Sequence, residues 1–567
     1  MEETPRYDLK SIRVPRLAGK MLALFVRLVE NRLTQSLLIQ RLLKDTGIIQ
    51  IRKIQVEEAP EYYPLYPQAK DPKIFEVSVS DPLQELLRYP RIPAKGFAFP
   101  TIGDYAKAYR SGKITPQEVA QKIIAAMEES DRHLPPLKAF IACQREDLLK
   151  QAEASTRRFR ENCPLGILEG VPIGVKDEVD QVPYGTTVGT RIFGKTPALQ
   201  DSTVVAKVRA TGALLIGKTN MHEIGIGVTG LNPHYGVARN PYHLGHHTGG
   251  SSSGSAAATA AGFCPAAISA DGGGSIRIPA AFCGMVGLKA TFGRVSEFGA
   301  APLAWSVAHL GPIAVTAYDA AILYSVMAGP DSKDSNSLFQ PSPIWKDFDQ
   351  SDLKGITIGI YRDWFQHATP AMVESCEQLL KKLEEHGARI QEIYIPHLES
   401  IRLAHVVSIA SEMVTAMGPY YPKRRKEFGL DVRTNLGIAR ALKASDYVQA
   451  QRIRRRAMDD FQRVLQSVDL IVTPSTGCTA PPIRPQALPN GESDLAVLTE
   501  IMRFAPAGNL TGLPSISFPA GYDLNGLPIG FQAMGRPWEE HLLLRLAHLS
   551  EQWVERKKPE LYFPILP

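Results

Sequence analysis

Apolar positions after residue 100 alternate between the period of helices and that of short buried strands. Residues 104–131 predict two helices, the second capped near Thr115 and Pro116, and residues 201–212 predict a helix that ends at Gly212. Short apolar runs predict strands at 170–180 (running into a loop), 213–217, 468–477, 513–521 and 527–535. This alternation indicates an α/β architecture with a central sheet, in one large domain over residues 101–567.

The first 56 residues have a different pattern, that of amphipathic helices. Leu17, Met21, Leu24, Phe25 and Leu28 recur at helical spacing, with basic residues on the other side, and Gly47 is a plausible stop. One or two helices are expected in this arm. They either pack on their own domain, or lie on a membrane or cap an apolar pocket. Residues 57–100, rich in Pro and Tyr, predict an extended connector.

Charge separates the same arm from the rest of the chain. The 567 residues have an ordinary globular composition and a formal net charge of +6. Residues 1–56 hold eleven basic and five acidic residues, and the remainder holds equal numbers of each. A neutral body with one basic arm argues against nucleic-acid binding and suits an anionic membrane surface. The basic runs at 423–426 and 452–456 fit solvated helix faces better than a second membrane contact.

Cysteine spacing and the apolar runs exclude several classes of protein. The six cysteines are scattered, without a CxxC pair or a His/Cys cluster, so neither a disulfide framework nor a metal site is expected. The charged start predicts no signal peptide. No apolar run approaches the ~18 residues of a transmembrane span. We expect an intracellular protein.

One segment matches a nucleotide-binding motif. Gly212, Gly217, Lys218 and Thr219 fit the pattern of a phosphate-binding loop. That loop needs a strand before its first glycine, whereas here a helix precedes Gly212 and an apolar strand follows it. The sequence therefore disfavours nucleotide binding.

Three segments carry candidate chemistry. Lys176 follows an apolar strand; burial disfavours a charged amine, so it could act as a base, although an ion pair with Asp177 or Glu178 is the simpler alternative. Residues 248–256 hold consecutive serines and read either as a linker or as a tight turn around Ser251. In residues 271–279, three glycines precede Ser275, so backbone N–H groups could converge on an oxyanion, or the segment is only a structural turn.

The chemistry of these three segments does not require a histidine. His222, His243, His246 and His247 are candidate bases, but no G-x-S-x-G elbow accompanies them. A serine nucleophile with a lysine base is a known variant of the same chemistry.

Together, these segments resemble the amidase signature family. Ser251 follows Lys176 by 75 residues and Ser275 follows Ser251 by 24, and the resemblance extends over about residues 100–550. The arm, Thr229-Gly230-Leu231-Asn232 and residues 444–456 are similar to the plant-type fatty acid amide hydrolases in particular. The resemblance implies a twisted mixed β-sheet covered by helices on both faces, a homodimer, and neither cofactor nor metal.

The resemblance also implies roles for individual residues. Ser275 would be the nucleophile, Lys176 the base, and Ser251, after a cis peptide bond, the proton relay between them. Backbone N–H groups of Gly272, Gly273, Gly274 and Ser275 would form the oxyanion hole. The supporting residues would be Ser252, Asp271 and Arg277, and the acyl pocket would include Met21, Leu24, Phe25, Leu28, Val228 and Thr229.

The expected activity is hydrolysis of N-acylethanolamines and other long-chain fatty acyl amides through an acyl-enzyme, at the endoplasmic reticulum or plasma membrane. The basic amphipathic arm favours this interpretation. A soluble amidase for small amides such as indole-3-acetamide, and the amidase subunit of a tRNA-dependent amidotransferase, are the alternatives.

Overall fold

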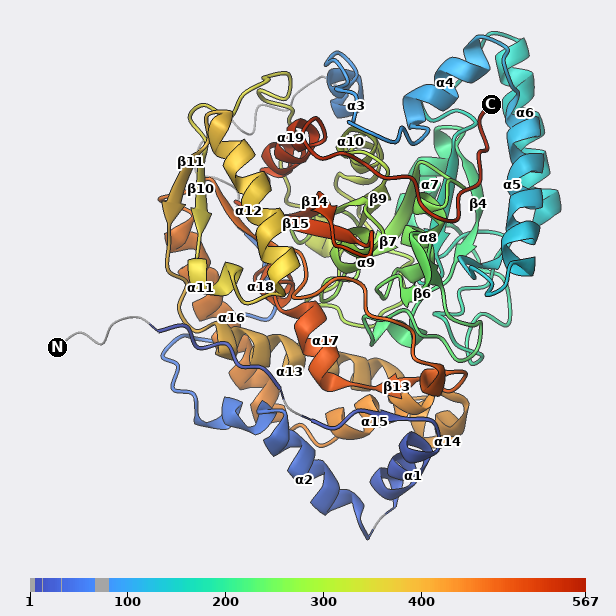
Figure 1. Ribbon diagram of the computed structural model, residues 1–567. Helices are drawn as coiled ribbons and strands as arrows, with labels where there is room; N and C mark the ends of the chain where they lie inside the picture. Colours follow the sequence, from blue (N-terminus) through green and yellow to red (C-terminus); the bar gives the residue numbers. More distant parts are fainter. Residues whose placement is uncertain (1–5, 13, 32, 67–80) are drawn as a thin grey trace.

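A large mixed sheet lies at the centre of the computed structural model, which describes residues 6–12, 14–31, 33–66 and 81–567 (Figure 1). Eleven strands form this sheet. In sheet order they are β11 (Arg389–Glu392), β10 (Thr357–Ile360), β12 (Leu470–Pro474), β15 (Pro528–Gly535), β14 (Ser515–Tyr522), β8 (Val286–Lys289), β9 (Leu310–Ala314), β7 (Ala266–Ala270), β3 (Pro172–Lys176), β4 (Leu214–Thr219) and β2 (Phe140–Ala142). The middle of the sheet is antiparallel, whereas β7, β3 and β4 are parallel neighbours.

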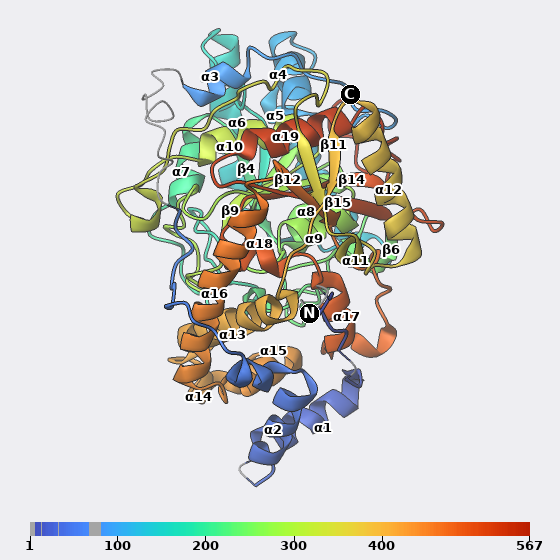
Figure 2. The same cartoon turned by 90° about the vertical axis from the view of Figure 1, so that its left-hand side faces the viewer.

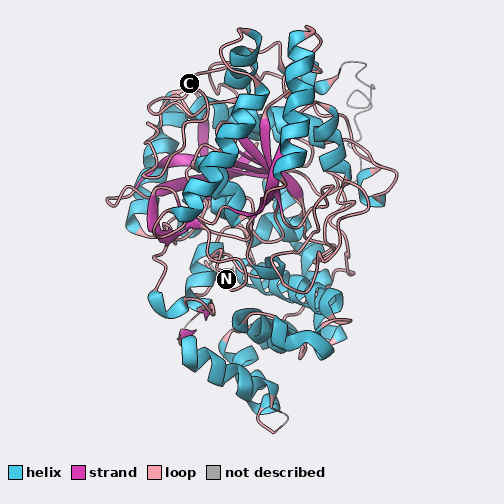
Figure 3. Cartoon of the chain, turned by 90° about the vertical axis from the view of Figure 1, so that its right-hand side faces the viewer, coloured by secondary structure: helices cyan, strands magenta, loops and turns pink. Residues whose placement is uncertain are grey.

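Helices cover both faces of the sheet (Figure 3). On β15, a Cβ added at Gly530 would lie 2.5 Å from the Ala281 side chain of α9 (Arg277–Phe282), and one at Gly535 would lie 3.5 Å from Leu543 of α19 (Glu540–Ser550). Because side chains alternate along a strand, positions 530 and 535 face opposite sides. Helix α9 therefore covers one face and α19, with its neighbour α10 (Ala317–Met327), the other. The expected α/β fold, a single domain with a mixed sheet, is confirmed.

The elements that the sequence pattern predicts are present. The two helices within 104–131 are α4 (Ile102–Arg110) and α5 (Pro116–Arg132), and Thr115 caps α5 in a reciprocal capping box with Glu118. The helix predicted to end at Gly212 is α7 (Thr203–Ala210). The predicted strands are β3, β4, β12, β14 and β15.

A second group of helices lies below the sheet in the view of Figure 1. It comprises α13 (Leu398–Met417), α15 (Leu430–Ala439), α16 (Ala444–Val464), α17 (Leu495–Met502) and α18 (Pro506–Thr511). The N-terminal arm forms α1 (Gly19–Glu30) and α2 (Gln35–Asp45), which project beyond this group (Figures 1 and 2). Helix α1 packs on α15, and Glu30 pairs with Arg433 at 2.7 Å.

The arm buries a different face from the one that its leucine spacing suggests. Leu22, Val26 and Val29 are the buried residues of α1, whereas Met21 and Leu24 are 62% and 50% exposed. Leu28, Leu33 and Leu37 are exposed as well. The reason is that α15 covers only one side of this short helix, so the remaining apolar residues stay in contact with solvent.

The predicted connector, residues 57–100, includes residues 67–80, which lie outside the described residues. Its described parts run along the surface without regular structure, except for the short helix α3 (Pro82–Leu86). The basic run at 452–456 helps to hold the connector, since Arg452 donates to Glu58 O and Arg454 to Tyr62 O. Arg454 is buried, so the expectation of a wholly solvated basic face is wrong for this run.

No helix in the described part of the chain is both long and apolar enough to cross a bilayer.

Candidate active site

Parallel strands bring the candidate residues to one edge of the sheet. Strands β3 and β7 are paired in parallel, with Val175 opposite Ile268, so their carboxyl ends meet at the same edge. Lys176 is the last residue of β3, and Asp271 follows the last residue of β7 directly. Lys176 and the segment from Asp271 to Ser275 therefore lie at the same edge of the sheet, although they are far apart in the sequence.

Lys176 is buried and its amine has three acceptors. Nζ lies 2.8 Å from Ser251 Oγ, 3.3 Å from Ala270 O and 2.7 Å from Glu178 Oε2. The expected alternative, an ion pair, is therefore present with Glu178, but it is buried and coexists with the contact to Ser251. Asp177 faces away from this amine and lies 3.9 Å from Lys218 Nζ.

Ser251 lies in a turn that the small residues around it make possible. The Gly250–Ser251 peptide bond is cis. Helix α8 (Ser253–Ala260) begins two residues later, and all its residues are buried. A Cβ at Gly254 would lie 2.2 Å from both Ala139 O and Asn220 N, so only glycine allows this approach. Ser252 donates to Ala270 O at 3.1 Å, which links the turn to β7.

The glycine loop before Ser275 offers unpaired N–H groups beside the Ser275 side chain. Among the described residues, the N–H groups of Gly272, Gly273 and Ser275 have no hydrogen-bond acceptor. That of Gly274 donates instead to Asp271 Oδ1 at 2.6 Å. Three of the four predicted oxyanion-hole donors are thus available, and the fourth holds the loop in shape.

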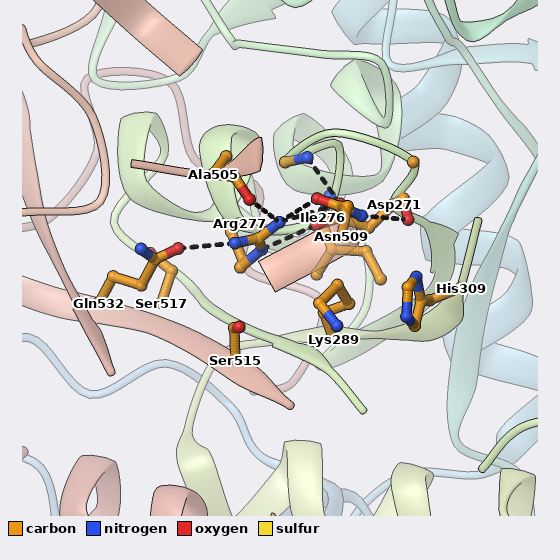
Figure 4. Close-up of polar contacts among 12 residues, drawn as sticks. Asp271, Ile276, Arg277, Lys289, His309, Ala505, Asn509, Ser515, Ser517 and Gln532 are labelled. Carbon is orange, nitrogen blue, oxygen red and sulfur yellow. Dashed lines mark hydrogen bonds and ion pairs between the residues drawn. The ribbon is translucent and has the colours of Figure 1, made fainter. Parts of the chain in front are cut away.

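Asp271 is the centre of a buried network behind this loop (Figure 4). Its carboxylate pairs with Arg277 Nε at 3.0 Å and accepts from Ile276 N at 3.1 Å and Asn509 Nδ2 at 2.9 Å. Arg277 also donates to Asn509 Oδ1 and to Gln532 Oε1, at 2.6 and 2.7 Å. Burial alone would raise the pKa of Asp271, but the Arg277 guanidinium and Asn509 hold it well below its usual range. The network fixes where Ser275 lies.

Several residues of this region were not predicted from the sequence. Asn509 and Gln532 lie more than 230 residues from Asp271 and Arg277 along the chain. His405 of α13 faces Gly272 O at 2.8 Å, and burial lowers the pKa of its imidazole to about 4. Lys289 lies beneath the network in Figure 4, and burial lowers its pKa well below the usual value. In the sequence, only a polar residue within an otherwise apolar segment, such as Asn509, could have indicated that such residues belong to the site.

A cavity extends from these groups into the group of helices below the sheet. Its polar end holds Lys176, Glu178, Ser251, Gly272, Gly273 and Ser275. Beyond them the lining is mostly apolar and comes from α13, α15 and α17, with Ile12 and Ile48 from the arm; examples are Ile409, Met413, Ile438, Leu498 and Met502.

Of the six predicted acyl-pocket residues, one lines the cavity and five do not. Val228 lines the cavity, but Met21, Leu24, Phe25, Leu28 and Thr229 are not part of its lining. The arm reaches the cavity through other positions, because α1 itself packs on the outer side of α15.

The nucleotide motif has a structural explanation. Gly217, Lys218 and Thr219 lie inside β4, and Lys218 is buried, with Nζ donating to Val179 O. A buried strand cannot wrap around a phosphate. His247, another candidate in the sequence, is also buried, and this burial lowers its pKa to about 3. No group of three or more potential metal ligands is found in the described ranges.

Comparison with known proteins agrees with this geometry. A family model described as Amidase matches residues 121–544. The fatty acid amide hydrolase of Arabidopsis thaliana is 40% identical over 590 aligned residues, covering 99% of this chain and 97% of that protein. That of Oryza sativa subsp. indica is 41% identical, with coverages of 99% and 96%. The solved peptide amidase of Stenotrophomonas maltophilia matches with a TM-score of 0.71 at 28% identity, covering 82% of this chain and 98% of that one.

Proposed function

Because the chain belongs to the amidase signature family of hydrolases, we propose that it cleaves N-acylethanolamines and other long-chain fatty acyl amides to the free acid and amine. The observation that carries the proposal is the apolar cavity that begins at Ser275 and continues between α13, α15 and α17. Each methylene buried there contributes about 0.8 kcal/mol to binding, which favours a long acyl chain over a small acid. The names of the plant relatives support the same substrate class.

The reaction uses the contacts around Lys176. Ser251 Oγ takes the proton of Ser275 Oγ and passes its own to neutral Lys176, as Ser275 attacks the amide carbonyl carbon. The N–H groups of Gly272, Gly273 and Ser275 stabilise the oxyanion, each by about 3 kcal/mol. Lys176 returns a proton through Ser251 to the leaving nitrogen, the C–N bond breaks, and water then hydrolyses the acyl ester on Ser275.

The arm brings this cavity to a membrane surface. Large apolar side chains are exposed on α1, on α2 and in the turn between them: Met21, Leu24, Leu28, Leu33 and Leu37. Lys20, Arg27 and Arg41 are exposed near them, which suits an anionic lipid surface. Ile12 and Ile48 of the same arm line the cavity, so a lipid substrate has a short path from the bilayer.

The active form is a homodimer, which sedimentation of the purified chain tests.

A substrate panel with one cavity variant tests the proposed activity. Competitive turnover of acyl ethanolamides of increasing chain length should favour long chains over acetamide, indole-3-acetamide and glutamine. Ala410→Phe narrows the cavity from α13 and should lower kcat/KM for the long amides much more than for short ones. Thr415→Phe, at an exposed position on the same helix, is the matched control and should leave the ranking unchanged. A preference for acetamide or glutamine in the wild type would contradict the proposal.

Trapping by a fluorophosphonate tests the mechanism. Ser275→Ala should abolish labelling, and Lys176→Ala should slow it by a large factor and flatten its pH dependence near neutrality. Labelling of Lys176→Ala at the wild-type rate would mean that another group is the base.

A further inference from the structure

The imidazole of His405 lies against the glycine loop that precedes Ser275. Its Nε2 is 2.8 Å from Gly272 O, and a Cβ added at Gly273 would lie 2.9 Å from its Cε1. In the described part of the chain, Nδ1 of the same ring is buried and has no hydrogen-bond partner. Because a carbonyl oxygen only accepts, Nε2 carries the proton and donates a hydrogen bond to Gly272 O.

Burial keeps this ring neutral, and the surrounding helices hold it in place. His405 is fully buried in α13, and burial lowers the pKa of its imidazole to about 4. A neutral imidazole has one N–H group, so the bond to Gly272 O uses the only donor of the ring. Helix α13 packs on α16 and α18, and Gln451 of α16 donates to Ser408 Oγ at 2.9 Å. The helix group, rather than the loop itself, therefore fixes the position of this donor.

The hydrogen bond determines how the peptide group between Gly272 and Gly273 is oriented. This peptide bond is trans, so its C=O and its N–H point in opposite directions. The carbonyl is directed at His405, and the N–H of Gly273 is therefore directed away from the imidazole. Among the described residues this N–H has no acceptor, and Gly273 lines the cavity together with Ser275.

Glycine on both sides makes this peptide group prone to rotation. Residues without a Cβ reach backbone angles that other residues resist, so a Gly-Gly peptide flips at little steric cost. A flipped peptide would place the carbonyl oxygen of Gly272 where the N–H of Gly273 now lies. The oxyanion would then meet an acceptor in place of a donor. Loss of one oxyanion-hole donor lowers kcat by about 10²–10³.

We infer that His405 is a positioning residue for the oxyanion hole: its hydrogen bond to Gly272 O holds the N–H of Gly273 toward the reacting carbonyl oxygen. The inference rests on the proposed function, because it requires Ser275 to be the nucleophile and the loop N–H groups to bind the oxyanion. His405 acts through the loop and neither gives nor takes a proton in the reaction.

The position of His405 on α13 also places it beside the acyl cavity. His405 lines this cavity together with Ile409 and Met413, which follow on the same face of the helix. A substitution that only changed the shape of the cavity would alter the KM for long acyl amides. Loss of an oxyanion donor lowers kcat instead, because the charge on the oxygen forms only in the transition state. The two roles therefore have different kinetic signatures.

Three variants of the full-length chain test the hydrogen bond, with folding checked by thermal unfolding. His405→Phe keeps a buried aromatic ring without a donor and should lower kcat for a long-chain acyl ethanolamide by about 10²-fold, with KM little changed. His405→Gln places an amide N–H near the position of Nε2 and should recover most of the lost kcat. His541→Phe on α19 replaces another histidine whose pKa burial lowers to about 4, and this matched control should leave kcat unchanged.

Inhibitor affinity gives a second readout, which a merely structural role of His405 would not move. A long-chain acyl trifluoromethyl ketone becomes a hemiketal oxyanion when Ser275 Oγ adds to its carbonyl carbon and the proton of Ser275 passes through Ser251 to Lys176. The corresponding carbinol has no carbonyl group and binds through its acyl chain alone. His405→Phe should weaken binding of the ketone by about 10²-fold and leave binding of the carbinol nearly unchanged.

The outcomes separate this inference from the proposed function. An unchanged kcat in His405→Phe, equal losses of affinity for ketone and carbinol, or a kcat for His405→Gln as low as that of His405→Phe overturns the role of His405. An equal fall of kcat in His541→Phe overturns it as well. If His405→Phe does not fold, His405→Leu carries the same expectations. Failure of the wild-type chain to label at Ser275 with a fluorophosphonate overturns the proposed mechanism instead, independently of His405.

Discussion

Replacing Asp271 by Asn is a direct test of the network behind the nucleophile loop. The Asp271 carboxylate accepts hydrogen bonds from Gly274 N, Ile276 N and Asn509 Nδ2 and pairs with Arg277, all of them buried. An Asn side chain keeps one acceptor oxygen but directs an NH₂ group at donors. Arg277 would be left as a buried cation without a counter-charge.

The expected magnitude follows from that loss. Removing one partner of a buried ion pair costs about 3–5 kcal/mol. Unfolding entropy near 2.1 cal/mol/K per residue gives roughly 1.2 kcal/mol/K for a chain of 567 residues, so Tm should fall by about 3–4 °C. Release of the Gly274 anchor also misplaces the oxyanion donors, and loss of one such donor lowers kcat by about 10²–10³.

Calorimetry and fluorophosphonate labelling measure the two effects. Arg277 holds the pKa of Asp271 below its unfolded value, so this stabilisation is fully present above about pH 4 and is lost only in stronger acid. The difference in Tm between variant and wild type should therefore be constant from pH 5 to 8. Asp45→Asn, at an exposed ion pair with Arg41, is the control and should shift Tm by far less. An Asp271→Asn protein with wild-type Tm and labelling rate would refute the reasoning.

Three further predictions concern packing, pH and the membrane. Gly254→Ala places a Cβ 2.2 Å from two backbone atoms and should lower the free energy of unfolding by about 1–3 kcal/mol in chemical denaturation. Gly166→Ala, which has open space around its Cβ, is the control and should leave the free energy of unfolding unchanged. Equal denaturation midpoints for the two variants would contradict the close approach at Gly254. Burial raises the pKa of Asp319 to about 7, so the folded chain binds the carboxyl proton more tightly than the unfolded chain does. The stabilisation of the fold by this protonated carboxyl group is therefore complete below about pH 4 and is lost as the pH rises through 7. The Tm of Asp319→Asn minus that of the wild type should thus rise between pH 4 and 8. A difference in Tm that does not change with pH would refute the raised pKa of Asp319. Replacing Leu24 and Leu28 by Glu should weaken cosedimentation of the protein with anionic vesicles. Leu199→Glu, at an exposed position elsewhere on the surface, is the control and should leave cosedimentation unchanged. Unchanged binding of the double variant would mean that the arm does not contact the membrane.

The sequence by itself determined the elements and the local chemistry of this protein. Helix and strand periods located α4, α5, β3, β4 and the late strands, because each depends on apolar residues close together in the chain. The spacing of Lys176, Ser251 and Ser275 indicated the family, and that resemblance implied the turn at Ser251, whereas the small residues around it left a linker and a tight turn open.

The tertiary structure decided the properties that depend on contacts between distant segments. Leucine spacing made α1 amphipathic, but the position of α15 decided that Leu22, Val26 and Val29 are buried and that Met21 and Leu24 are exposed. The sequence placed two acidic residues after Lys176, and only the turn at the end of β3 selects Glu178 as its partner. The Asp271 network likewise needs Asn509, 238 residues away. Such contacts arise from how the layers pack, which a local pattern of apolar and polar residues does not specify.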